Sequence, residues 1–160
     1  MIKGTWELEF DGGSTLSLEA PSPWNDLAPV KNYSDWATYR IGFDVPEGGA
    51  GLEWWLDLGS VRETAEASLN GTALGAAWKG ARRLKCTAAL KAGRNQLAVR
   101  VGNLWVNNYY TRPKRNLKPV AETLGIRWGT SGEIPPKTTP PSGLLGPVRL
   151  LPLRRRTEKW

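Results

Sequence analysis

The sequence of 160 residues contains no histidine and a single cysteine, Cys86. The absence of histidine excludes Ser-His-Asp and Cys-His nucleophile arrangements and nearly every catalytic zinc site. A lone cysteine excludes an intrachain disulfide and thiolate metal clusters. Because no histidine can activate it, Cys86 within RRLKCTAAL is expected to be a small buried hydrophobic residue.

The sequence also lacks any apolar run of the roughly 18 residues that a membrane-spanning helix needs. Its first residues, MIKGTWELEF, contain no apolar signal-peptide core, although a leader is removed from a mature exported protein. No long stretch has helical periodicity, whereas glycine (18), proline (12) and tryptophan (9) are abundant. This composition predicts a soluble domain of many short strands and turns, without a membrane partner.

Alternating hydrophobic and polar residues predict several strands, most clearly in ATYRIGFDV (residues 37–45) and NQLAVRV (residues 95–101). Asn70-Gly71 separates two further candidates and is typical of a type I′ hairpin turn, which needs positive φ at both central residues. Roughly nine strands at such spacing predict an all-β fold, a β-sandwich jelly roll. We expect one domain over residues 1–153, with a long basic, proline-rich loop at about 110–143 and a flexible tail at 154–160.

Positive charge is concentrated in the last third of the chain. Residues 1–111 contain 11 Lys and Arg against 12 Asp and Glu, whereas residues 112–160 contain 11 against 3. A basic segment of this kind attracts anionic partners such as acidic polysaccharides or nucleic acids, and it can equally be a solvated face and tail. Nucleic acid is the less favoured partner, because no RNA-binding strand motif is present.

Clusters of aromatic and polar side chains provide the candidate binding residues. The stretch NLWVNNYYTRPKR, residues 103–115, places three aromatic residues beside amides and cations, and a second cluster joins Trp78 to Arg82. Flat aromatic faces with amide or guanidinium groups around them are suited to sugar rings. Trp105 can instead close the core, and Trp36 is either a packing residue or a ligand platform. The predicted carbohydrate-binding residues are Trp36, Trp78, Arg82, Trp105, Asn107, Asn108, Tyr109 and Tyr110.

A resemblance covers residues 33–110 and 140–150. The ordered segments YSDWATYRIGFDVPEG, LDLGSVRETAEASLNGTALGAAW, LKAGRNQLAVRVGNLWVNN and PPSGLLGPVRL resemble the galactose-binding-like jelly-roll domain of large glycoside hydrolases. The similarity is greatest to the terminal domain of family 106 enzymes, which are α-L-rhamnosidases, and more distant to the sugar-binding domain of family 2. This chain departs from the family pattern at Asp35 and Trp36, which replace small residues, and at Lys85 and Cys86, which replace an acid and a valine.

The resemblance implies a non-catalytic module, because catalysis in these enzymes belongs to another domain. The carboxyl pairs Glu53 with Asp57 and Glu63 with Glu66 look like ordinary surface charge rather than the acid pair of a glycosidase. We therefore expect a carbohydrate-binding module that recognises an oligosaccharide or polysaccharide, with an acidic polymer favoured by the basic segment. The alternative is a structural accessory domain that packs against a catalytic glycosidase domain. No cofactor is expected, structural calcium is left open, and the resemblance implies a secreted or periplasmic location.

Overall fold

The computed structural model describes residues 1–31, 33–47, 52–78, 82–103 and 141–154. These residues form an all-β sandwich, as predicted, with two short 3₁₀ turns at Trp24–Asp26 (η1) and Ala28–Val30 (η2). The strands are β1 (Trp6–Phe10), β2 (Thr15–Leu18), β3 (Trp36–Val45), β4 (Leu52–Asp57), β5 (Ser60–Val61), β6 (Thr64–Leu69), β7 (Thr72–Trp78), β8 (Arg83–Lys85), β9 (Gly93–Gly102), β10 (Leu144–Gly146) and β11 (Arg149–Arg154).

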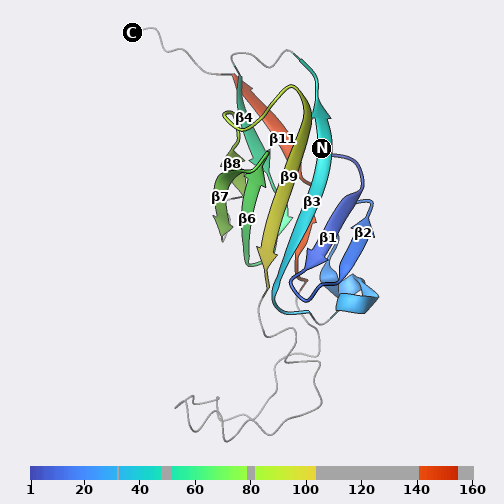
Figure 1. Ribbon diagram of the computed structural model, residues 1–160. Coiled ribbons are helices and arrows are strands. Elements are labelled where there is room, and N and C mark those ends of the chain that lie inside the picture. The colour runs from blue at the N-terminus through green and yellow to red at the C-terminus, as the bar shows by residue number, and fades with distance from the viewer. Residues whose placement is uncertain (32, 48–51, 79–81, 104–140, 155–160) are drawn as a thin grey trace, which may run out of the picture.

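The larger layer is a six-stranded antiparallel sheet with the order β2-β1-β3-β9-β6-β7 (Figure 1). Its two long central strands, β3 and β9, pair without a break from Trp36 opposite Gly102 to Val45 opposite Gly93. This continuous register fixes which side chains of β3 and β9 share a face, because the side-chain period of a strand is two.

The smaller layer lies behind the six-stranded sheet in Figure 1 and contains β11-β4-β8, with the short pair β10-β5 beside it. One continuous hydrophobic core fills the space between the layers, and Leu56 of β4 and Leu144 of β10 meet residues of the larger sheet there. Burial of both inner faces is the main source of stability in such a sandwich.

The strand predictions agree with this arrangement. Tyr39 and Ile41 of β3 and Val99 and Val101 of β9 point into the core, and the residues between them face outward. The Asn70-Gly71 turn joins β6 to β7, with φ of 52° and 81° at the two residues, as a type I′ turn requires. Residues 104–140, which include most of the predicted basic loop, and residues 155–160 of the predicted tail lie outside the described residues.

One end of the core is built from aromatic side chains. Trp24 of η1 is completely buried and donates a hydrogen bond from Nε1 to the Tyr39 hydroxyl, 2.5 Å away. The same hydroxyl oxygen accepts a hydrogen bond from the Leu144 amide at 3.1 Å.

Cys86 is also buried, as predicted, and burial raises the pKa of its thiol to about 11. Trp24, Tyr39 and Cys86 are therefore structural residues.

Candidate functional site

Four strands of the larger sheet present one outward-facing row of residues near the end of the sandwich where β9 and β7 finish. Trp36 pairs with Gly102, Gly102 with Thr64, and Thr64 with Trp78, across β3, β9, β6 and β7. The next residues in register are Ala37, Val101, Ala65 and Ala77, all of which are fully buried in the core. Because neighbouring residues of a strand point to opposite faces, Trp36, Gly102, Thr64 and Trp78 all face outward. We call these four residues the tryptophan row.

Trp36 lies flat on the sheet because its cross-strand partner has no side chain. A Cβ atom at Gly102 would lie 3.1 Å from three atoms of the six-membered ring of Trp36. The guanidinium carbon of Arg100 lies 4.7 Å from the centroid of the Trp36 ring. The Trp36 backbone is also fixed, since its carbonyl accepts hydrogen bonds from the Tyr33 hydroxyl at 2.8 Å and the Asp11 amide at 3.1 Å. The indole is thus held in one orientation before any ligand arrives.

Trp78 forms the other end of the tryptophan row. It is the last residue of the edge strand β7, and 65% of its surface is exposed. Three strand spacings separate β3 from β7, so the backbones of Trp36 and Trp78 are about 14 Å apart. Between the two backbones, the Trp36 ring covers Gly102 and Thr64 is small, which leaves a low floor at Thr64 with an indole on each side.

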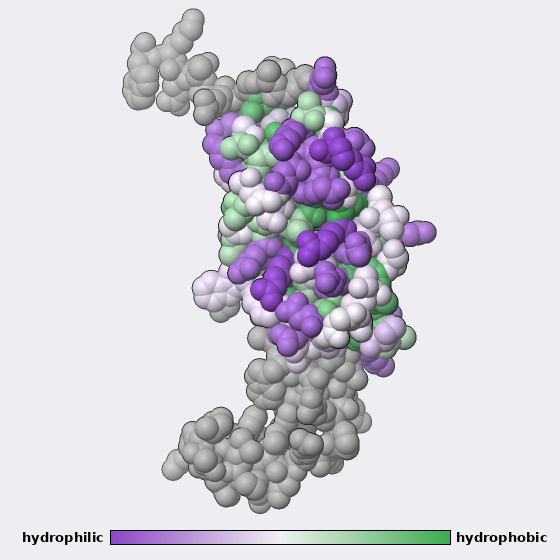
Figure 2. Space-filling view, viewed as in Figure 1, coloured by the Kyte–Doolittle hydropathy of each residue, from purple (hydrophilic) through white to green (hydrophobic). Residues whose placement is uncertain are grey.

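The next outward-facing row of the larger sheet, two residues along each strand, borders this floor and is mostly polar. There, Thr38, Arg100, Glu66 and Ala76 occupy successive strands. Arg100 donates a hydrogen bond to the Asp11 carboxylate at 2.8 Å, and Glu66 is exposed. Figure 2 looks onto the six-stranded sheet and shows hydrophilic side chains gathered across this face. Two indoles beside a low floor, with hydroxyl, carboxylate and guanidinium groups at its border, can contact both the apolar faces and the hydroxyls of sugars.

The structure brings together only part of the predicted site. Trp36 and Trp78 belong to one face, whereas Arg82 is exposed on the segment leading to β8 of the other layer, where its carbonyl accepts a hydrogen bond from the Leu58 amide at 2.9 Å. The five remaining predicted residues, Trp105, Asn107, Asn108, Tyr109 and Tyr110, lie outside the described residues.

Sequence reasoning missed the residues that connect the two tryptophans. Gly102, Thr64, Arg100 and Glu66 became candidates only through cross-strand register, which joins positions up to 66 residues apart in the chain. The alternation of NQLAVRV did carry one usable signal, because it places Arg100 on the face opposite to Val99 and Val101.

The outer face of the smaller sheet has a different character. Trp55 of β4 and Leu151 of β11 are directly paired and half-buried, and Leu153 is 51% exposed. Among the described residues, Trp55 Nε1 is the buried side-chain polar atom without a hydrogen-bond partner. Two ion pairs flank this apolar patch, Lys85 with Glu53 at 2.7 Å and Arg83 with Asp57 at 3.3 Å. We call Trp55, Leu151 and Leu153 the apolar patch.

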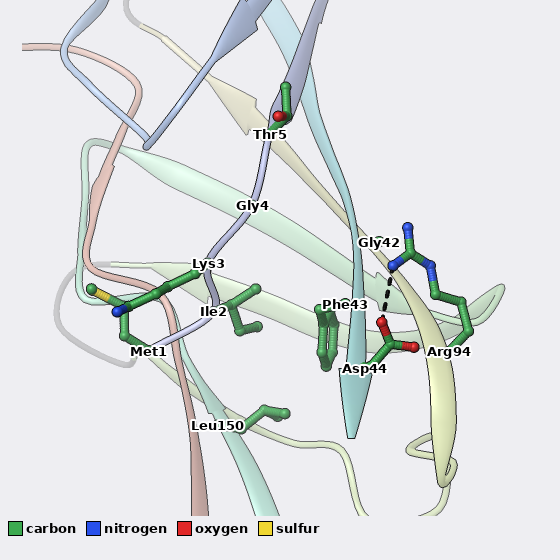
Figure 3. A pocket seen from close by; sticks show the side chains of 10 residues that line it. All are labelled: Met1, Ile2, Lys3, Gly4, Thr5, Gly42, Phe43, Asp44, Arg94 and Leu150. Atoms are coloured by element: carbon green, nitrogen blue, oxygen red, sulfur yellow. Dashed lines mark hydrogen bonds and ion pairs between the residues drawn. The ribbon is translucent and has the colours of Figure 1, made fainter. Parts of the chain in front are cut away.

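A hollow lies at the opposite end of β3 from the tryptophan row, beside the first residues of the chain (Figure 3). Its polar border includes Asp44 and Arg94, which are paired with each other at 3.2 Å. Its aromatic residue, Phe43, is only 7% exposed and is therefore a core residue. This hollow offers no open aromatic face, so it fits a sugar ring less well than the tryptophan row.

The carboxyl pair Glu53 with Asp57 is engaged in ion pairs on the smaller sheet. Asp57 accepts hydrogen bonds from the Gly59 amide at 2.9 Å and from Arg83, and Glu53 is paired with Lys85. No group of three or more His, Cys, Asp or Glu side chains in the described part of the chain is placed to hold a metal ion. Within the same residues no helix has the length and apolar character needed to cross a bilayer.

Comparisons with known proteins match this chain to a small part of larger enzymes. No family model matches the sequence. A candidate beta-glucuronidase of Formosa agariphila is 31% identical over an alignment 182 positions long, which covers 94% of this chain and 15% of that protein. The structure of a rhamnosidase from Novosphingobium sp. PP1Y matches 94% of this chain with a TM-score of 0.76 and 33% identity, over 14% of the rhamnosidase.

More distant structures share the fold alone. Beta-glucuronidases of Dictyoglomus thermophilum and Ruminococcus gnavus match 63% of this chain, with TM-scores of 0.56 and 0.57 and identities of 18% and 21%. The chain spans between 14% and 20% of the length of the proteins it matches. It is thus a small non-catalytic domain, similar along nearly its whole length to an accessory β-sandwich domain of large glycoside hydrolases.

Proposed function

We propose that this domain binds carbohydrate through the tryptophan row. The observation that carries the proposal is the register of Trp36 and Trp78, which places two tryptophans on one outward face with their backbones about 14 Å apart. The Trp36 ring covers Gly102, so the small Thr64 is the row residue that separates the two indoles. A glycan chain lying across the strands can stack one ring on each indole, while the rings between pass over the low floor. The two stacked rings would anchor an internal stretch of a chain rather than a single sugar.

The local structure supports binding with little reorganisation. Trp36 is already held flat by Gly102, Arg100 and its backbone hydrogen bonds, so little side-chain entropy is lost when a ligand covers it. Arg100 and Glu66 together supply donors and acceptors for hydroxyl groups. Similarity to a domain of glycoside hydrolases supports the same ligand class and supports action outside the cytoplasm, where such polymers occur.

Docking to a catalytic glycosidase domain is a second candidate function, and the apolar patch favours it. Leu153 is half-exposed beside Trp55, whose buried Nε1 lacks an acceptor among the described residues. A partner domain that covers this patch would bury apolar area and could supply the missing acceptor. The patch lies on the smaller sheet and the tryptophan row on the larger one, so one domain can perform both tasks.

Affinity electrophoresis and isothermal titration calorimetry test the first function. The probes are neutral glucans, mannans, galactans, xylans and rhamnans, together with their acidic counterparts. Wild type is compared with Trp36→Ala and Trp78→Ala, and Trp55→Ala on the smaller sheet is the matched control. We expect at least one polymer to bind wild type and the control equally and both row variants more weakly. Absence of binding to every polymer at millimolar sugar concentration would leave docking as the function.

A further inference from the structure

The tryptophan row has one charged side chain beside its centre, Glu66, that forms no ion pair with any residue that the structure describes. Glu66 is two residues beyond Thr64 on β6, points to the same outward face and is exposed. Its cross-strand partner is Arg100, but Arg100 gives its hydrogen bond to Asp11 at 2.8 Å and lies against the ring of Trp36. Among the described residues, Glu66 takes part in none of the ion pairs.

Counted over the described residues, the charge beside the floor is therefore negative. Arg100 and Asp11 cancel each other, which leaves the Glu66 carboxylate as the net charge next to Thr64. A carboxylate is purely an acceptor and can bind two sugar hydroxyls at once. The same carboxylate repels the carboxylate of a uronic acid or a sulfate group placed on the floor, because like charges in contact across an interface are unfavourable.

We propose that Glu66 is a specificity-determining residue, which makes the tryptophan row select uncharged glycan chains and reject carboxylated or sulfated ones. This inference rests on the proposed carbohydrate-binding function. It differs from the expectation drawn from the basic residues 112–160, because it concerns the charge at the floor itself rather than the charge of the whole chain. A basic segment elsewhere can still attract acidic polymers without recognising them.

The test uses matched pairs of ligands that differ only in charge. Soluble β-glucan, mannan and galactan are each compared with the same polymer after oxidation of its primary alcohols to carboxylates. Dissociation constants are measured by calorimetry for wild type and for Glu66→Gln, which keeps the size of the side chain and removes its charge. Glu7→Gln is the control, because Glu7 is an exposed carboxylate on the same face, three strands away from Glu66.

The measured quantity is the ratio of affinities for the oxidised and the neutral form of one polymer. We expect Glu66→Gln to raise this ratio at least fivefold, mainly through tighter binding of the oxidised form, while Glu7→Gln changes it less than twofold. Comparing this ratio among the three proteins cancels any general attraction of the basic segment for anions, since that attraction is the same in all three. An unchanged ratio in Glu66→Gln overturns the inference but leaves the proposed function intact. If only oxidised polymers bind wild type, the inference fails and the proposed function stands; if no polymer of either kind binds, both fail together.

Discussion

Replacing Trp78 by alanine should separate binding from stability. Trp78 is 65% exposed at the end of an edge strand, so its side chain contributes little to the core. The free energy of unfolding should therefore change by no more than about 0.5 kcal/mol, as for most surface substitutions away from special features. Urea denaturation followed by far-ultraviolet circular dichroism measures this change.

The loss of affinity follows from the area that a stacked sugar would cover. If one ring face is covered, roughly 75 Å² of an aromatic side chain that can bury 150–250 Å² is removed from water, which at about 25 cal/mol per Å² is about 2 kcal/mol. Trp78→Ala should then weaken binding of a neutral polysaccharide about thirtyfold, and Trp78→Phe should recover part of that loss. Calorimetric titration of the three proteins with one polymer gives the values.

Two outcomes would refute this reasoning. Binding that weakens less than twofold would show that Trp78 does not contact the ligand. A loss of more than about 2 kcal/mol in unfolding free energy would show that the exposed indole supports the fold, and any effect on affinity would then be indirect.

Two further predictions concern the core. Burial raises the pKa of the Cys86 thiol from 9.0 to about 11, so the thiol of the unfolded chain ionises first as the pH rises. The free energy of unfolding should therefore fall by about 2 to 3 kcal/mol between pH 9 and 11. Under reducing conditions Cys86→Val should remove this part of the decline, and parallel pH curves for the two proteins would contradict the prediction. Tyr39→Phe removes the acceptor for Trp24 Nε1 and the Leu144 amide and should cost about 2 to 3 kcal/mol in urea denaturation, whereas a cost below 0.5 kcal/mol would mean that another group accepts these hydrogen bonds.

Much of the fold could be predicted from local patterns. Alternation in residues 37–45 and 95–101 identified β3 and β9 because one face of each strand is buried, and Asn70-Gly71 identified the hairpin because few dipeptides adopt two successive positive φ angles. The order of the strands in the sheet could not be predicted from such local patterns. Nothing local in residues 64–69 shows that β6 pairs with β9 on one side and β7 on the other, because that choice depends on how the core as a whole is filled.

The candidate site was predictable to the same degree. Trp36 and Trp78 were predicted as candidate binding residues because they are tryptophans near polar or charged residues, but their relationship depends on a register shared by four strands. The role of Gly102 could not be inferred either, since a glycine at a strand end usually marks a turn or a bulge. Here it provides the space in which the Trp36 ring lies flat.

The most direct test of the account is to observe the indoles during ligand binding. Two-dimensional NMR of the ¹⁵N-labelled protein, with indole Nε1–H signals assigned through single Trp→Phe variants, follows each tryptophan as a neutral oligosaccharide from the tightest-binding polymer is added. We predict that the signals of Trp36 and Trp78 shift together with one dissociation constant, while that of the fully buried Trp24 stays in place. Binding that shifts Trp55 of the smaller sheet and leaves Trp36 and Trp78 unmoved would contradict the claim that the tryptophan row is the sugar site.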